Sequence, residues 1–355
     1  MKNSTTDSRA NMTVHTLLAA CLLAGIAAQP VLAQTASAPA APALVAKPKP
    51  TREVPFKAPN LAALSHEPNG AEILYGYRLM TQTRKLLPHN VGAAMNCTSC
   101  HLGGGFVPHS SAFVGQNVLY PMYNGRAARV VSMADRINGC MLRSMNGKPI
   151  PKDSREMKAM LAFMAWMSKD VPADAKVKGA ALYKISTSIK PDPVRGKAIY
   201  AERCAACHGI DGQGSKNAKG EYVFPPLWGP DSFNIGAGMA RTYTAAGFVK
   251  GAMPVADSLH PPTGVGRMSA SARPPEGGAQ LPRGVERSEE GGSMSDQDAV
   301  DVAAYFSHQP RPDFPMSIYD WPKGGAPKDV RYCLVSLGNC TPAEIARAPK
   351  PPGGK

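Results

Sequence analysis

Apolar residues recur at helical spacing in two segments of the first half of the chain. Residues 67–86 and 153–169 place apolar side chains three or four positions apart, which predicts a helix in each segment. Asp153 or Ser154 is positioned to cap the second helix, and Pro172 stops it. The expected buried stripe of this second helix is Met157, Leu161, Met164 and Ala165.

Two more segments of this kind lie in the second half of the chain. A helix is expected to start at about Pro193, because proline suits the first turn of a helix. Another is expected over 295–308, where Ser295 is the cap and Pro310 ends the helix. Its expected buried side consists of Val300, Val302, Ala303 and Phe306.

These elements predict an all-α fold of two small domains in tandem, with long irregular loops. The first domain is expected over residues 61–176, a linker over 177–192 and the second domain over 193–315. Residues 316–355 are expected to form an irregular tail. Residues 260–292 are rich in Gly and Pro and nearly free of large apolar side chains, so they are expected to be a disordered insertion.

Residues 1–33 have the features of a secretory signal peptide. Their apolar run ends in small residues at positions 31 and 33, so cleavage is expected after Ala33. One alternative is a membrane anchor, for which the run is short. A lipoprotein site at Cys21 is another, but little apolar sequence precedes it. Residues 34–60 are expected to form a flexible Ala/Pro-rich tether, and export predicts a periplasmic protein without stable membrane insertion.

The formal net charge of +14 predicts anionic partners. Small anions and acidic proteins fit this charge. Nucleic acid is excluded as a partner because the chain is expected to be exported.

Two Cys-x-x-Cys-His motifs carry the most specific chemistry of the sequence. Two thiols at this spacing can reach the two vinyl groups of one haem, and the adjacent histidine then becomes an axial ligand of the iron. We therefore expect two covalently bound haem c groups, one in each domain. Thioredoxin-like motifs or structural disulfides are disfavoured, because two complete motifs are improbable by chance. The residues concerned are Cys97, Cys100, His101, Cys204, Cys207 and His208.

The second domain offers a methionine as the other axial ligand. Met253 follows His208 by 45 residues, and small His/Met cytochromes take their methionine from an irregular segment. The carbonyl of Pro225 is expected to accept a hydrogen bond from the second ring nitrogen of His208. The competing methionines are Met239, Met268 and Met294.

The first domain has a cysteine in a similar place. Cys140 follows His101 by 39 residues and is a candidate thiolate ligand of the iron. It could instead be a free buried thiol or form a disulfide with Cys333 or Cys340. If Cys333 pairs with Cys340, Cys140 is left without a disulfide partner. The fallback ligands are Met122, Met133 and Met145.

The residues around Cys140 resemble those of the dihaem thiosulfate dehydrogenases. The run Arg-Ile-Asn-Gly-Cys-x-x-Arg-Ser-Met-Asn-Gly-Lys, between the two haem motifs, carries the resemblance, which spans most of residues 67–257 and 294–315. The first domain is also similar to the cytochrome subunit of the sulfur-oxidising multienzyme complex. One departure is Ala252, where the family often has Lys or Asn.

The resemblance implies roles for individual residues. His101 and Cys140 would ligate a catalytic haem, and Arg126 and Arg136 would line a thiosulfate site. His208 and Met253 would ligate an electron-exit haem. The implied reaction joins two thiosulfates into tetrathionate and passes two electrons to an external cytochrome or other redox protein. The reverse reaction, tetrathionate reduction, is also allowed.

The chemistry of the residues agrees with an anionic sulfur substrate. Guanidinium groups suit a small dianion, and Arg126, Arg129, Arg136 and Arg143 all lie near Cys140 in the sequence. They could instead form salt bridges or bind haem propionates. We also hypothesise that the sulfur of Cys140 forms a covalent adduct with thiosulfate. The alternatives are a non-enzymatic dihaem electron carrier and a subunit of the sulfur-oxidising complex.

Overall fold

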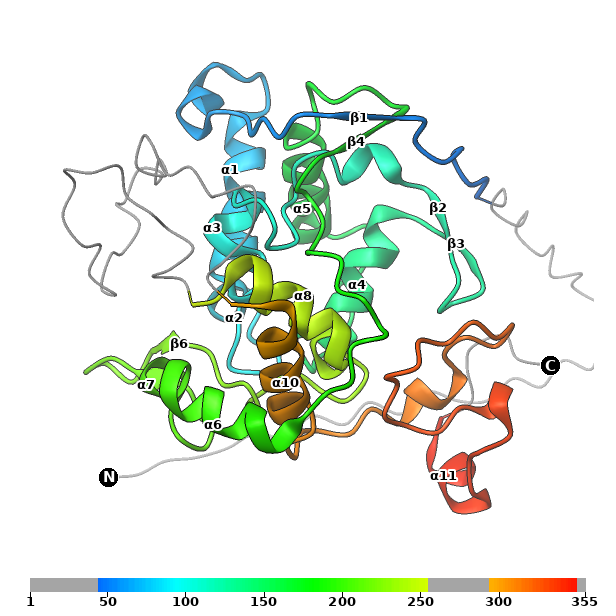
Figure 1. Ribbon diagram of the computed structural model, residues 1–355. Helices are drawn as coiled ribbons and strands as arrows, with labels where there is room; N and C mark the ends of the chain where they lie inside the picture. The colour runs from blue at the N-terminus through cyan, green and yellow to red at the C-terminus, as the bar shows by residue number, and fades with distance from the viewer. Residues whose placement is uncertain (1–43, 255–293, 350–355) are drawn as a thin grey trace, which may run out of the picture. The chain divides into compact units, whose positions relative to one another are not determined.

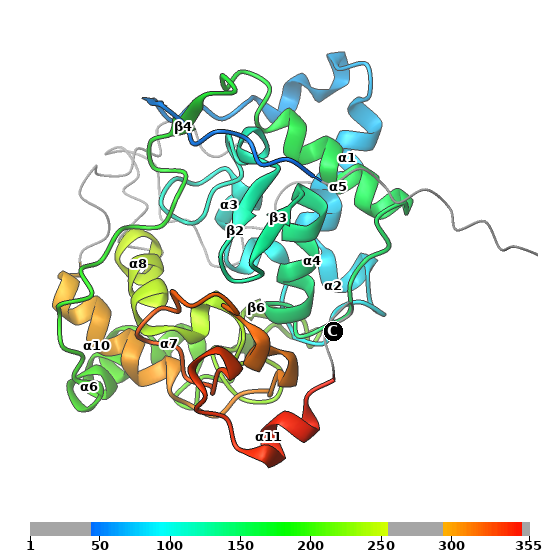
Figure 2. The ribbon, with the colours of Figure 1, turned by 90° about the vertical axis from the view of Figure 1, so that its right-hand side faces the viewer.

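The computed structural model describes residues 44–254 and 294–349, which are mostly helical with three two-stranded sheets (Figures 1 and 2). The expected all-α class is confirmed, with these small sheets as additions. Within the described ranges, no helix combines the length and apolarity needed to span a bilayer. The expected signal peptide over 1–33 and the expected insertion over 260–292 lie outside the described residues.

The elements of the first half begin with a strand and end with its partner strand. They are β1 (Arg52–Val54), the 3-10 helix η1 (Leu61–His66), α1 (Gly70–Thr81), α2 (Thr83–Leu86), η2 (Cys97–Ser99), α3 (Leu102–Gly105), η3 (Asn117–Leu119), β2 (Met122–Asn124), β3 (Arg129–Val131), α4 (Met133–Arg143), α5 (Arg155–Trp166) and β4 (Ala175–Val177).

The second half is built around three longer helices. Its elements are α6 (Pro193–Arg203), α7 (Ala205–His208), β5 (Ser215–Lys216), β6 (Tyr222–Phe224), η4 (Gly238–Ala240), α8 (Thr242–Ala252), α10 (Asp296–Ser307), η5 (Pro315–Tyr319), η6 (Val335–Leu337) and α11 (Pro342–Arg347).

Helices α1 and α5 pack against each other in the first domain. They approach closely at Gly76, where an added Cβ would come within 2.1 Å of the Ala159 carbonyl oxygen. The helix expected over 67–86 is divided at Gln82 into α1 and α2. Ser154 is the cap of α5, and its side chain accepts a hydrogen bond from the backbone N–H of Met157.

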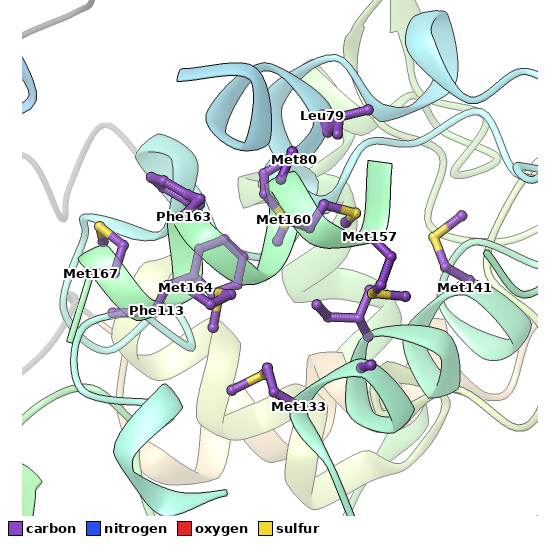
Figure 3. Packing of buried hydrophobic residues seen from close by; sticks show 14 of the residues in the cluster. Leu79, Met80, Phe113, Met133, Met141, Met157, Met160, Phe163, Met164 and Met167 are labelled. Carbon is purple, nitrogen blue, oxygen red and sulfur yellow. The ribbon is translucent and has the colours of Figure 1, made fainter. Parts of the chain in front are cut away.

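The buried face of α5 differs from the expected stripe. Ala165 is exposed and Leu161 only partly buried, whereas Met157 and Met164 are buried as expected. The close approach to α1 rotates the helix, so the core face consists of Met157, Met160, Phe163, Met164 and Met167 (Figure 3).

Part of the segment expected to be a tether folds onto the first domain. Strand β1 pairs with β4 in parallel, with Glu53 opposite Lys176. Arg52 forms an ion pair with Asp174 at 3.0 Å. These long-range partners cannot be read from a segment that lacks periodicity. Residues 34–43 lie outside the described part of the chain.

Helix α10 is the centre of the second domain. It packs against α6 and α8, and Ser295 caps it through the N–H of Asp298. All four residues of its expected apolar side are buried, and so is Asp301. Helix α8 was not expected, because its small and apolar residues are buried on nearly every side and show no periodic pattern.

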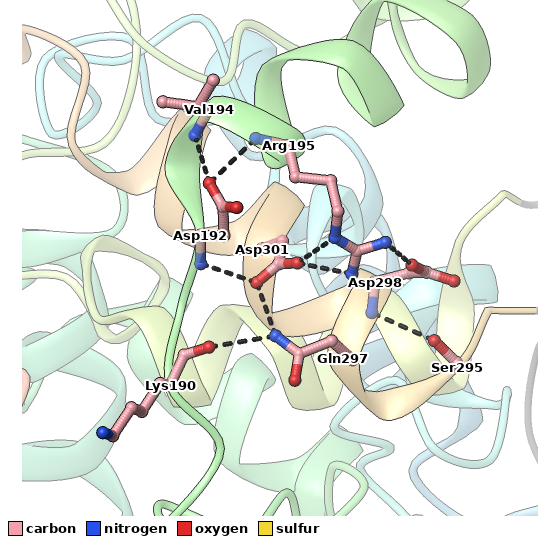
Figure 4. A network of polar contacts seen from close by, with 8 residues as sticks. All are labelled: Lys190, Asp192, Val194, Arg195, Ser295, Gln297, Asp298 and Asp301. Carbon is pink, nitrogen blue, oxygen red and sulfur yellow. Dashed lines mark hydrogen bonds and ion pairs between the residues drawn. The ribbon is translucent and has the colours of Figure 1, made fainter.

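A polar network joins the starts of α6 and α10 (Figure 4). Nε of Arg195 donates to the buried Asp301 carboxylate at 2.6 Å, and its Nη1 donates to Asp298 at 2.5 Å. The other Asp301 oxygen accepts from the N–H of Asp192 at 2.7 Å and from the Gln297 amide at 2.9 Å. The buried charge is therefore both paired and hydrogen-bonded, as its burial requires.

The tail after the second domain contains only short helical elements, but a covalent bond closes part of it into a loop. A disulfide joins Cys333 to Cys340, with 4.9 Å between their Cα atoms. Of the alternatives open for these two cysteines, pairing with each other is the one observed.

The Arg195 network generates a stability prediction. Replacing Arg195 with Gln leaves the buried Asp301 carboxylate without its cation, so the free energy of unfolding should fall. Denaturant unfolding of the haem-loaded chain measures this change. Lys197→Gln, an exposed change on the same helix, is the control and should have little effect. Equal stability of Arg195→Gln and wild type would contradict a structural role for the network.

Candidate functional site

The first Cys-x-x-Cys-His motif lines a cavity of about 270 Å³. The motif starts in η2 and runs into α3, so Cys97, Cys100 and His101 all border the same space. Methionine side chains make up much of the rest of the wall, and such flexible apolar groups adapt to a flat ligand. They are Met80, Met95, Met133, Met141, Met145, Met160 and Met164.

Both motif histidines are oriented through their Nδ1 atoms. His208 Nδ1 lies 3.0 Å from the Pro225 carbonyl oxygen, which confirms the expected acceptor. His101 Nδ1 lies 2.5 Å from the carbonyl of Ser111, an acceptor that the sequence did not indicate. Donation to a carbonyl fixes the ring and leaves Nε2 available for a metal. The two domains thus prepare an axial histidine in the same way.

None of the four motif cysteines is in a disulfide. Burial raises the pKa of Cys97 to about 11 and that of Cys100 to about 12. Burial also raises the pKa of Cys204 to about 11. Unpaired thiols beside a correctly oriented histidine fit covalent haem attachment and contradict a structural disulfide within either motif.

Cys140 has the opposite electrostatic environment. It lies on α4, one turn after Arg136, whose Nη1 donates to the Cys140 Sγ at 2.9 Å. Burial opposes ionisation of this thiol, but Arg136 and His101 outweigh burial and lower its pKa to about 6. Cys140 is therefore a thiolate at neutral pH, and it is not in a disulfide. Both it and His101 border the cavity.

Arg136 is the one of the four neighbouring arginines that contacts Cys140. It borders the cavity, and the Cys140 thiolate raises the pKa of its guanidinium. Arg129 instead pairs with Asp135 at 3.4 Å, beside the capping box at the start of α4. Arg143 pairs with Asp320 at 2.7 Å.

Arg126 is held by the tail. Its Nε lies 3.0 Å from an Asp320 oxygen, and its Nη2 donates to the Tyr332 hydroxyl at 2.8 Å. Its guanidinium also stacks over the Trp321 ring, at 4.6 Å from the centroid. Asp320 is itself buried and pairs with both Arg126 and Arg143. Arg126 does not border the cavity, and its expected place in a thiosulfate site stays a prediction.

No local sequence pattern predicts these tail contacts. Asp320 lies 194 positions after Arg126 in the printed sequence, in a segment expected to be irregular. Only the folded chain brings them together.

The alternative ligands of the first domain differ in position. Met133 and Met145 border the cavity, whereas Met122 is exposed on β2. Neither of the two cavity methionines has a cation beside its sulfur comparable to Arg136 at Cys140. Cys140 is therefore the candidate ligand that the local electrostatics favour.

Met253 directly follows α8 and is its C-terminal cap. Its side chain and that of Cys204 pack against the same core cluster of the second domain. Among its competitors, Met294 is buried, Met239 packs against the cores of both domains, and Met268 lies outside the described residues. Ala252, before Met253, is fully buried and offers no ligand atom.

Comparison with known proteins agrees with this arrangement. The family model for the SoxA/TsdA cytochrome c domain matches residues 89–173, and the cytochrome c model matches residues 193–309. Both haem motifs fall within these matches. The chain carries two covalently bound haem c groups, one in each cytochrome c domain.

Individual relatives match most of the chain. A thiosulfate dehydrogenase of Psychrobacter arcticus is 40% identical over 276 residues, covering 78% of this chain and 74% of the relative. One of Allochromatium vinosum is 37% identical, covering 76% of this chain and 90% of the relative.

A solved structure is also similar. Thiosulfate dehydrogenase (TsdBA) from Marichromatium purpuratum superimposes with a TM-score of 0.60 at 33% identity. The alignment covers 73% of this chain and 50% of that longer chain, so this chain spans half of it.

The two motifs predict separate covalent attachment. A Cys204→Ala/Cys207→Ala double variant should retain one covalent haem, because the first domain keeps both of its thiols. Intact mass under denaturing conditions should show the loss of one haem relative to wild type. Cys333→Ala/Cys340→Ala, which removes two cysteines outside the motifs, should keep both haems. A double motif variant that still carried two covalent haems would show that attachment does not follow the motifs.

Proposed function

This chain belongs to the thiosulfate dehydrogenase family, and we propose that it oxidises two thiosulfates to tetrathionate in the periplasm. The observation that carries the proposal is the Cys140 thiolate, which accepts a hydrogen bond from Arg136 and shares the haem cavity with His101. The two relatives named above are both thiosulfate dehydrogenases, which supports thiosulfate as the substrate class. An external cytochrome or another redox protein accepts the electrons, and the reverse reaction uses the same site.

His101 and Cys140 would hold the haem iron of the first domain, and His208 and Met253 that of the second. Each haem would supply a one-electron acceptor, with a lower potential where a thiolate holds the iron and a higher one where a thioether holds it.

The Cys140 sulfur is the proposed nucleophilic centre. The outer sulfur of one thiosulfate forms an S–S bond with the Cys140 thiolate, and two electrons leave for the haems. The second thiosulfate attacks the thiosulfate sulfur that is bonded to the Cys140 sulfur. This attack forms tetrathionate and releases the Cys140 thiolate. Arg136 stabilises the thiolate and attracts the dianion, because a guanidinium keeps its charge and offers two parallel donors.

Arg126 enters this proposal through the family resemblance. Its charge is partly neutralised by Asp320, so its contribution to substrate binding should be smaller than that of Arg136. Together with Arg136 it makes the region around Cys140 attractive to anions.

A turnover assay tests the proposed activity. Purified haem-loaded protein should reduce ferricyanide when thiosulfate is added and should form one tetrathionate per two electrons. Cys140→Ser should lower kcat by at least about a thousandfold, because it removes the nucleophile. The visible spectrum checks that both haems remain bound. Full turnover by Cys140→Ser would exclude the adduct, and an inactive wild type with both haems reducible would favour the electron carrier.

The arginines make a second prediction. Arg136→Gln should lower kcat/KM by about 10²–10³, as does the loss of a donor that stabilises developing negative charge. Arg129→Gln is the matched control, because Arg129 pairs with Asp135 and does not contact Cys140. It should retain wild-type kcat/KM. Steady-state kinetics over a range of thiosulfate concentrations measures both, and equal losses in the two variants would argue against a specific role for Arg136.

A further inference from the structure

A second pocket, of about 420 Å³ and bordered by several charged side chains, lies at the C-terminal end of α10. We call it the tail pocket. Its wall combines the residues that follow α10 with the disulfide-closed tail, and Cys333 is part of that wall. The cavity at Cys140 shares none of its residues.

Arginines dominate the charge of the tail pocket. Arg311, Arg331 and Arg347 border it, together with the acids Asp313 and Glu344. Both acids are already engaged. Asp313 lies 3.7 Å from Arg347, and Glu344 accepts hydrogen bonds from the N–H and hydroxyl of Thr341, the cap of α11.

Arg311 and Arg331 therefore have only neutral partners among the described residues. Arg311 donates to the carbonyls of Phe306 and Ser307, at 2.7 and 3.3 Å, and Arg331 donates to that of His308 at 3.2 Å. These carbonyls end α10, so the arginines cap the helix and favour its dipole. A carbonyl does not neutralise a full positive charge.

Both guanidinium groups also keep an unsatisfied donor. Arg311 Nε and Arg331 Nη1 are buried and have no hydrogen-bond partner. Arg311 is further fixed by stacking on Phe233, at 4.4 Å from the ring centroid. Both residues border the tail pocket, and no described carboxylate pairs with either charge, an arrangement that an oxyanion would complete.

The pKa values of Arg311 and Arg331 are lowered because no opposite charge compensates for their burial. Burial, reinforced by the neighbouring Arg331, lowers the pKa of Arg311 to about 9. Burial also lowers the pKa of Arg331. A bound anion would oppose both effects, because an opposite charge favours the protonated form.

We propose that the tail pocket is an anion site that binds one small divalent oxyanion, such as sulfate or the sulfonate end of thiosulfate, between Arg331 and Arg311. The ligand class follows from the two guanidinium groups at the wall, because permanent positive charges suit an oxyanion. The site does not depend on the reaction proposed at Cys140. The disulfide holds Arg331 in place, because Cys333 follows it by two positions.

Sulfate binding to the oxidised, haem-loaded full chain tests the site. Isothermal titration calorimetry with sodium sulfate, against sodium chloride of equal ionic strength, should give saturable binding with one site. Arg331→Gln should weaken this binding by about tenfold or more, because one charge-assisted fork is lost. Arg331→Lys, which keeps the charge without the fork, should lie between the two.

Two controls locate the anion. Lys328→Gln removes an exposed charge that does not border the pocket and should leave sulfate affinity unchanged. Arg136→Gln removes the cation of the haem cavity and should also leave it unchanged. The unfolding temperature must match wild type in every variant, and the visible spectrum must match in the variants outside the haem cavity.

The opposite pattern would overturn the proposal. Sulfate binding that is lost in Arg136→Gln but kept in Arg331→Gln would place the anion in the haem cavity. An absence of saturable binding in wild type would show that the arginines act only as helix caps. Thiosulfate, added without an electron acceptor, should displace sulfate if the substrate anion is also a ligand; a failure to do so would restrict the site to sulfate-like ions.

Discussion

A permanently charged guanidinium beside a cysteine sulfur at the cavity wall is the interaction around which the first domain is organised. Arg136 and Cys140 are one helical turn apart, so a single helix presents both on one face. That helix must start at a defined residue for the pair to face the cavity, and the capping box of Ser132 and Asp135 sets its start. Lys152 and Arg129 hold the Asp135 carboxylate, which burial would otherwise tend to protonate.

Both domains orient the motif histidine in the same way, but the sulfur proposed as the second iron ligand differs between them. Each orients its motif histidine by a hydrogen bond to a backbone carbonyl, at Ser111 and at Pro225. The first domain then presents a thiolate stabilised by a cation, and the second a thioether at the end of a buried helix. If these sulfurs hold the irons as proposed, the charged thiolate would favour oxidised iron and the neutral thioether reduced iron. This difference would give electron flow a direction without any change of fold.

The tail, although irregular, affects the charge of the protein in two places. Its Asp320 neutralises Arg126 and Arg143, which would otherwise repel each other near the first domain's site. Its Arg331 donates to a carbonyl at the end of α10, where none of the described carboxylates pairs with it. The tail thus reduces positive charge at one place and increases it at another. The disulfide between Cys333 and Cys340 restricts the chain that links these two regions.

The sequence by itself determined the features that depend on residues close in the chain. The haem motifs, the caps at Ser154 and Ser295, and the Pro225 acceptor all follow from local spacing. Tertiary structure decided the features that join distant segments. It placed Asp320 against Arg126, paired β1 with β4 and turned α5 so that Ala165 is exposed. Periodicity reports which side of a helix is apolar, but the neighbour it packs against sets the final rotation. The charge on an arginine is likewise visible in the sequence, whereas the carboxylate that neutralises it is chosen only when the chain folds.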